Sequence, residues 1–132
     1  MLKTYRGACH CGAVQFEADL DLTEPTFRCN CTICRRTRFW AAVARPEGFR
    51  LLAGGDELTH YLFGRKKNEH YFCRHCGVRP FGVGNDTPIG KMYGVNLGCL
   101  EVSDEELADV PITYVDGLHD RWDTRPAAFA HL

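Results

Sequence analysis

Short runs of alternating apolar and polar positions recur along the chain, a pattern typical of β-strands. In residues 13–18 the alternation places Val14, Phe16 and Ala18 on one face of an extended segment. Residues 39–44 form an apolar run that ends before Pro46, which is typical of a buried strand. Further strands are predicted at residues 58–63, 70–72, 92–97 and 112–115. The pattern therefore predicts a mainly-β fold.

Helical signals are few. In residues 103–108, Ser103 and Glu106 have the spacing of a capping box, and Pro111 would end the helix. The segment after Cys34 is a second candidate for a helical turn. Thirteen glycines and six prolines are spread along the 132 residues without repeats, low-complexity stretches or a linker. One domain covering residues 1–132, with one or two short helices, is expected.

Charge narrows the possible partners. Lys and Arg number 16 and Asp and Glu 17, for a net charge of −1, so a strongly basic nucleic-acid-binding domain is excluded. No apolar run approaches the roughly 18 residues of a membrane span, and residues 1–7 lack the apolar core of a secretory signal. We expect a cytoplasmic protein, in which thiols stay reduced, with neither nucleic acid nor membrane as partner.

The spacing of the cysteines is the most informative feature of the sequence. Seven of the eight cysteines fall into three tight clusters, and one stands alone. Clustered cysteines in a reducing compartment are typical of metal sites rather than of a disulfide framework. Thiolate ligands favour zinc or iron, and we expect zinc. The clusters are Cys9 with Cys11, then Cys29, Cys31 and Cys34, and then Cys73 with Cys76, whereas Cys99 is isolated in an apolar setting and is expected to act as a small hydrophobe.

Two of the clusters are pairs. Cys73 and Cys76 form a C-x-x-C turn followed by Gly77, which brings two sulfurs within reach of one tetrahedral metal. A thioredoxin-like redox pair has the same spacing, but it would need a βαβ context that the pattern does not predict. Cys9 and Cys11 point to one face if their segment is extended. The two pairs together would close a structural four-thiolate zinc site, and the intervening His10 and His75 are expected to be solvated.

The third cluster holds three thiols within six residues, which leaves one position of a tetrahedral zinc open to water or substrate. A fourth protein ligand would close this second site, and the candidates are His60, His70, His119 and Cys99. The spacing also permits other partitions, such as Cys9 and Cys11 with Cys29 and Cys31. Arg35, Arg36 and Arg38 follow directly, where they could stabilise a centre of net charge −1, bind carboxylates of an anionic ligand, or simply be solvated.

These clusters, in this order, resemble the glutathione-dependent formaldehyde-activating enzyme family, which includes the centromere protein V relatives. The resemblance rests on residues 7–12 (GACHCG), 29–36 (CNCTICRR) and 72–77 (FCRHCG), and extends to Arg121-Trp122 and to residues 126–129 (PAAF). It implies a β-tent fold of twisted antiparallel sheets clamped by zinc. It also implies two zincs per chain: a structural zinc held by Cys9, Cys11, Cys73 and Cys76, and a second, reactive and labile zinc held by Cys29, Cys31 and Cys34.

The resemblance further implies a zinc-dependent carbon–sulfur lyase that acts on a small thiol adduct such as S-hydroxymethylglutathione, with glutathione as its small-molecule partner. Arg35 and Arg36 would hold the carboxylates of the tripeptide, and no general acid or base is assigned. Two other functions stay open: a non-catalytic, zinc-stabilised binding module, and a thiol redox or metal sensor in which Cys31 and Cys34 form a disulfide when the metal leaves.

Overall fold

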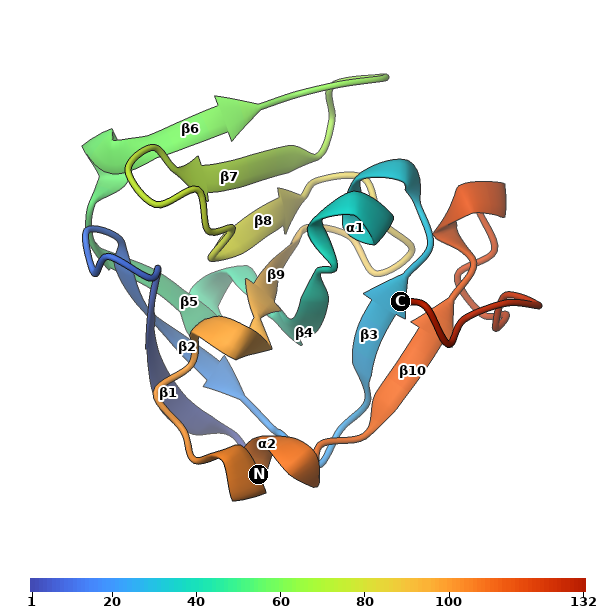
Figure 1. Cartoon of the computed structure of the whole chain (residues 1–132), viewed down its shortest axis with the longest axis horizontal. Coiled ribbons are helices and arrows are strands. Elements are labelled where there is room, and N and C mark those ends of the chain that lie inside the picture. Colours follow the sequence, from blue (N-terminus) through green and yellow to red (C-terminus); the bar gives the residue numbers. More distant parts are fainter.

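Two twisted sheets form the body of the protein in a computed structural model that describes residues 1–132 (Figure 1). The smaller sheet has the order β1 (Lys3–Ala8), β2 (Gln15–Leu20) and β5 (Phe49–Ala53). The larger sheet has the order β10 (Ile112–Val115), β3 (Thr26–Cys29), β4 (Trp40–Ala44), β9 (Met92–Asn96), β8 (Phe81–Gly84), β7 (Glu69–Cys73) and β6 (Leu58–Tyr61). All neighbouring strands are antiparallel except β10 and β3, which are parallel. The predicted mainly-β class is confirmed.

Six of the ten strands overlap the runs predicted from alternation, namely β2, β4, β6, β7, β9 and β10. Val14, Phe16 and Ala18 are fully buried, as their shared face requires. The four strands that alternation missed are β1, β3, β5 and β8. In β1 only Gly7 is buried, so its side chains carry little apolar signal, whereas all four residues of β8 are buried and two of them are glycines. Alternation therefore missed β1, which offers few buried side chains, and β8, in which no residue is exposed.

Two short helices are present, as expected: α1 (Thr32–Thr37) and α2 (Asp104–Ala108). The Ser103 hydroxyl accepts a hydrogen bond from the backbone N–H of Glu106 at 3.1 Å, which is the predicted N-cap. The Glu106 carboxylate accepts from the Tyr5 hydroxyl at 3.3 Å, so it ties α2 to β1. Single 3-10 turns complete the fold: η1 (Pro46–Gly48), η2 (Gly55–Glu57), η3 (Leu97–Cys99) and η4 (Gly117–His119).

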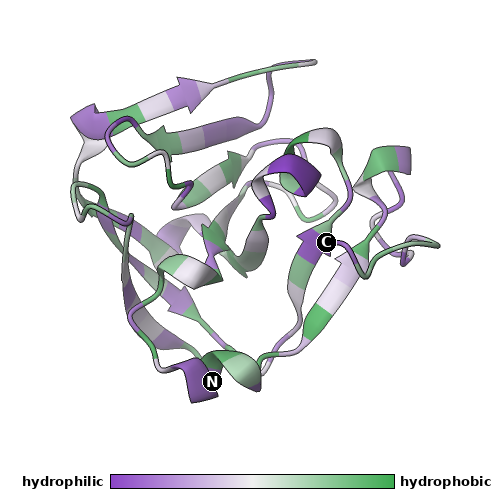
Figure 2. Ribbon diagram, viewed as in Figure 1, coloured by the Kyte–Doolittle hydropathy of each residue, from purple (hydrophilic) through white to green (hydrophobic).

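The main core lies between β2 of the small sheet and the central strands β4 and β9 of the large one. Phe16 stacks on Phe49 with ring centroids 5.5 Å apart, and Phe49 stacks in turn on Tyr93 at 4.4 Å, so aromatic rings link the two sheets. Figure 2 shows hydrophobic and hydrophilic residues alternating along several strands, whereas α1 combines both kinds and has no buried residue. The sheets are thus held together by packing, and α1 lies outside that core.

None of the helices has the length and apolar character needed to cross a lipid bilayer.

Candidate metal centres

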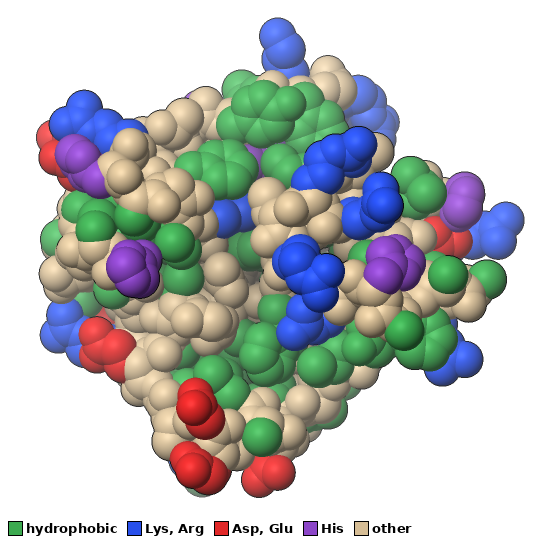
Figure 3. Space-filling model, in the orientation of Figure 1, with side chains coloured by type: hydrophobic (Ala, Val, Ile, Leu, Met, Phe, Trp, Pro, Cys, Tyr) green, Lys and Arg blue, Asp and Glu red, His purple; other side chains and the backbone are tan.

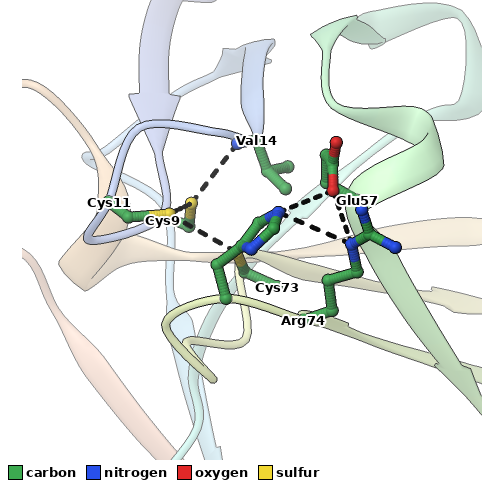
Figure 4. A network of polar contacts seen from close by, with 7 residues as sticks. Cys9, Cys11, Val14, Glu57, Cys73 and Arg74 are labelled. Carbon is green, nitrogen blue, oxygen red and sulfur yellow. Dashed lines mark hydrogen bonds and ion pairs between the residues drawn. The ribbon is translucent and has the colours of Figure 1, made fainter.

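Four cysteines meet where the turn after β1 approaches the end of β7, and Figure 4 shows three of them, Cys9, Cys11 and Cys73. The sulfurs of Cys9, Cys11, Cys73 and Cys76 all lie within 4.8 Å of one another. The Sγ atoms of Cys9 and Cys11 are 3.7 Å apart, and those of Cys11 and Cys73 are 3.6 Å apart. Zn–S bonds of about 2.3 Å in a tetrahedron give sulfur–sulfur edges of about 3.8 Å. The spacing of this group, hereafter the four-cysteine group, therefore fits zinc.

Both loops of the four-cysteine group turn at a glycine with positive φ. Gly12 has φ 81° and Gly77 has φ 76°, in the left-handed region that side chains disfavour. After each turn the first cysteine pairs with the returning chain: the N–H of Cys9 donates to the carbonyl of Val14 at 3.0 Å, and that of Cys73 to the carbonyl of Val78 at 2.9 Å. Each glycine thus folds its segment so that two sulfurs share one face.

Backbone N–H groups point at these sulfurs. The N–H of Val14 donates to Sγ of Cys9 at 3.3 Å. The pKa of the Cys73 thiol is lowered, chiefly because the backbone N–H of Cys76 donates to it. Cys9 and Cys73 are almost completely buried. Four sulfurs, two of them buried and supplied with N–H donors, have the character of a closed, structural site.

Glu57, at the end of η2, holds the second loop of the four-cysteine group from outside (Figure 4). Its carboxylate lies 2.6 Å from both Nε of Arg74 and Nε2 of His75, and its backbone carbonyl accepts from the N–H of Arg74 at 2.9 Å. The ring of His75 is therefore engaged by a carboxylate rather than by the sulfurs. His10 is exposed at the tip of the other loop.

The remaining clustered cysteines form a second group, hereafter the triplet. Cys29 ends β3, Cys31 immediately precedes α1, and Cys34 lies within α1. Their three sulfurs lie within 4.8 Å of one another, and no histidine or carboxylate belongs to the group. The chain therefore supplies three donors here, compared with four in the other group.

Hydrogen bonds among the three thiols of the triplet shift their pKa values in opposite directions. Hydrogen bonding by the Cys29 thiol, and then by Cys34, lowers the pKa of Cys31. The same contact with Cys31 raises the pKa of Cys29 to about 11, and contacts with Cys29 and Cys31 raise the pKa of Cys34. Three adjacent thiolates repel one another unless a cation lies among them, so this donor set fits a metal ion.

Each predicted candidate for a fourth ligand of the triplet has another partner. Nε2 of His60 is 3.0 Å from Glu69, Nδ1 of His70 is 2.8 Å from Arg79, and Nδ1 of His119 is 2.9 Å from Asp116. Cys99 packs against the main core, and burial raises its pKa to about 12. None of the four joins the triplet group.

The segment after β10 packs on the triplet, a contact that sequence reasoning missed. The side chain of Asn30, between Cys29 and Cys31, donates to buried Asp116 at 2.8 Å and accepts from the N–H of Leu118 at 2.9 Å. A Cβ at Gly117 would lie 2.4 Å from Sγ of Cys29. The triplet loop is thus anchored by protein contacts on both sides of Gly117.

The arginines beside the triplet are exposed. Arg35 and Arg36 lie in the last turn of α1, and Arg38 follows at its C-cap. In Figure 3, Lys and Arg side chains gather on the face where Figure 1 places α1. None of these three arginines forms an ion pair with a carboxylate, although Arg36 and Arg38 donate to the carbonyls of Thr32 and His131.

A fourth arginine near the triplet was not anticipated. Arg79 is 8% exposed, and its guanidinium lies 3.9 Å from the ring centroid of Phe39. Its Nη1 is 3.9 Å from Sγ of Cys34. The sequence places Arg79 three residues after Cys76, beside the other cysteine group, so only the fold shows that it lies against the triplet.

The fold and the two cysteine groups together define a small mainly-β protein with two cysteine clusters that could hold metal ions. Residues 4–116, which include every clustered cysteine, match the family described as glutathione-dependent formaldehyde-activating enzyme. The chain belongs to that family.

The chain is also similar to two individual proteins. A Halomonas elongata protein, provisionally named a glutathione-dependent formaldehyde-activating enzyme, is 31% identical over 84 residues, covering 53% of this chain. The match spans only 50% of that relative. A crystal structure of a Rhodobacter sphaeroides protein has a TM-score of 0.70 and 39% identity, and the match covers 82% of this chain and 99% of that one.

Proposed function

We propose that the protein is a carbon–sulfur lyase that acts, in either direction, on a small thiol adduct of the S-hydroxymethylglutathione type. The observation that carries the proposal is the triplet: three sulfurs that fit a metal, no fourth protein donor, and exposed arginines on the adjoining helix. Family membership supports glutathione as the thiol. The proposal assigns a structural zinc to Cys9, Cys11, Cys73 and Cys76, and a second, labile zinc to Cys29, Cys31 and Cys34.

A zinc ion at the triplet would supply an open coordination position and Lewis-acid character for the sulfur of the substrate. In cleavage, the C–S bond of the adduct breaks and its electron pair stays on sulfur. The hydroxyl of the adduct loses its proton and becomes the carbonyl of formaldehyde, while sulfur gains a proton to give the free thiol. Addition runs the same steps in reverse, and no oxidant or reductant is consumed.

The role of the chain beyond metal binding is to hold the tripeptide. Glutathione carries two carboxylates and would approach from the solvent side of α1. Arg35 and Arg36 are exposed and lack carboxylate partners, and only Nη1 of Arg36 donates to the chain, to the carbonyl of Thr32, so both guanidinium groups keep donors for those carboxylates. The anchored backbone around Asn30 keeps the three sulfurs in place when substrate binds.

The proposal also places the protein in the cytoplasm. Eight cysteines are present as free thiols, and the sulfurs in each cluster are spaced for metal binding. Thiolate sites of this kind keep their ligands reduced in a compartment buffered by glutathione.

Exchange spectroscopy on a mixture of glutathione and ¹³C-formaldehyde tests the activity. The wild-type protein should accelerate exchange between the free aldehyde and S-hydroxymethylglutathione, and Cys31→Ser should abolish the acceleration. Cys99→Ser, outside both groups, is the matched cysteine control. Replacing Arg35 and Arg36 with Gln should raise the glutathione concentration needed for half-maximal exchange by about 10-fold, equivalent to about 1.4 kcal/mol of lost binding.

The two alternative functions predict different results. A zinc-loaded wild-type protein that does not accelerate exchange would refute the lyase and leave a binding module. A redox sensor would instead form a disulfide between Cys31 and Cys34 under mild oxidant while keeping its fold, a product that mass spectrometry of digested protein detects.

A further inference from the structure

Arg79 is a buried cation without a carboxylate. In the sequence it lies between Cys76 and β8. Its side chain is 8% exposed and packs on the face of the Phe39 ring. No Asp or Glu oxygen lies within 4.0 Å of its guanidinium, in contrast to Arg50, which pairs with both Glu17 and Asp19. A buried charge is costly unless an opposite charge lies nearby. An anionic group close to Arg79 would therefore stabilise its buried charge.

Two of the hydrogen-bonding partners of the Arg79 guanidinium, His70 and Thr37, are neutral. Nη2 donates to Nδ1 of His70 at 2.8 Å, and Nη1 donates to the hydroxyl of Thr37 at 3.3 Å. Burial, reinforced by the charge of Arg79, lowers the pKa of His70 to about 4, so the imidazole accepts as a neutral ring. Nε of Arg79 is buried and has no partner at all. Neither contact balances the positive charge.

The fold reserves space for this guanidinium. A Cβ at Gly82 would lie 3.2 Å from Nη2 of Arg79 and 3.0 Å from the backbone oxygen of Glu69. With Gly82 on one side and Phe39 on another, the guanidinium is held with Nη1 3.9 Å from Sγ of Cys34. The only sulfur within hydrogen-bonding distance of Arg79 thus belongs to the triplet.

We propose that Arg79 is the positioning residue and counter-charge of the triplet centre. It donates from Nη1 to the Cys34 sulfur, and its charge balances the net −1 of three thiolates with one Zn²⁺. This inference rests on the proposed function and deepens it. A fixed cation 3.9 Å from Sγ of Cys34 favours the thiolate over the thiol at that sulfur, and only the thiolate binds zinc, so the cation favours the loaded form.

The size of the effect follows from the behaviour of residues that hydrogen-bond metal ligands, whose loss typically weakens metal binding about 10- to 100-fold. Arg79→Met keeps much of the volume and removes the charge and the donors. It should weaken the second zinc about 10- to 100-fold and leave the first unchanged. Because a buried, unpaired cation is removed, the melting temperature of the metal-free triplet form should stay the same or rise.

Competition with a chromogenic zinc chelator measures the two affinities separately. The absorption of Co²⁺ at the triplet adds a signature that a purely structural role would not move, because removing the N–H donor to Cys34 shifts the sulfur-to-cobalt charge-transfer band. Arg79→Lys, which restores the charge, should recover part of the affinity. Arg125→Met is the matched control, since Arg125 also lies on an aromatic ring, Phe129 at 4.4 Å, but contacts no cysteine.

An Arg79→Met protein that binds its second zinc with wild-type affinity and an unshifted cobalt band would overturn the inference while leaving the proposed lyase intact. If that variant does not fold, Thr37→Val is the second test. Thr37 is exposed, and the substitution removes the hydroxyl that accepts from Nη1 of Arg79. An unshifted cobalt band in Thr37→Val would equally overturn the inference. A wild-type protein that binds only one zinc would refute both proposals.

Discussion

Gly117 offers a direct way to perturb the triplet without touching a sulfur ligand. A Cβ at this position would lie 2.4 Å from Sγ of Cys29 and 2.9 Å from Cη2 of Trp122. Comfortable non-bonded contacts begin near about 3.5 Å, so Cys29 must move by roughly 1 Å in Gly117→Ala. The φ of Gly117 is outside the left-handed region, so the effect is steric and not one of backbone strain. Overpacking of this kind costs about 1–3 kcal/mol.

Rotation of Cys29 away from the triplet is the cheapest relief, because a single χ1 change moves Sγ. The overpacking free energy of about 1–3 kcal/mol then destabilises the zinc-bound state, which makes zinc binding at the triplet about 5- to 150-fold weaker. Chelator competition on purified Gly117→Ala measures this loss, with the four-cysteine group as internal reference. Gly55→Ala is the control, because its Cβ would meet only Leu51 at 3.4 Å. Second-zinc affinity within 2-fold of wild type would refute the placement of Gly117 against Cys29.

Three further predictions follow from the same packing. Cys73→Ser should unfold the protein or leave it insoluble, because zinc binding at a structural site is folding free energy; circular dichroism that shows a soluble, cooperative variant would contradict this. Phe16→Ala removes a fully buried ring and should cost about 3–5 kcal/mol in urea unfolding, and a loss below about 1 kcal/mol would argue against the core described. His70 is neutral in the folded protein, with a pKa of about 4 compared with about 6.5 in the unfolded chain. Its contribution to the free energy of unfolding is therefore constant above pH 6.5 and falls by about 2 kcal/mol towards pH 5. Stability curves of wild type and His70→Gln that stay parallel over this pH range would exclude the pKa shift.

The sequence supported those parts of the account that depend on local spacing. Alternation located β2 because Phe16 and Ala18 share one buried face, and the Ser103 cap followed from residue types three positions apart. The division of the cysteines into four and three follows the same logic, and the sulfur distances agree with it. The buried face of β2, the Ser103 cap and the spacing inside each cysteine cluster are local features, whereas the contact between Cys11 and Cys73 joins segments more than 60 positions apart.

Features that depend on contacts between distant segments could not be predicted from the sequence. The parallel pairing of β10 with β3 joins residues more than 80 positions apart, and the same pairing brings Gly117 against Cys29. Arg79 is an arginine like any other in the sequence, and charged side chains are almost always exposed. Only the approach of β7 and β8 to α1 buries Arg79 beside Cys34.

The central claim is that one chain carries two unequal metal centres. The most direct measurement is the zinc content of purified wild-type and Cys31→Ser protein by elemental analysis, each before and after incubation with excess glutathione and desalting. The account predicts two zincs in wild type that fall to one with glutathione, and a folded Cys31→Ser protein with one zinc that glutathione does not remove. One zinc in wild type, two that glutathione leaves in place, or a collapsed Cys31→Ser fold would contradict it.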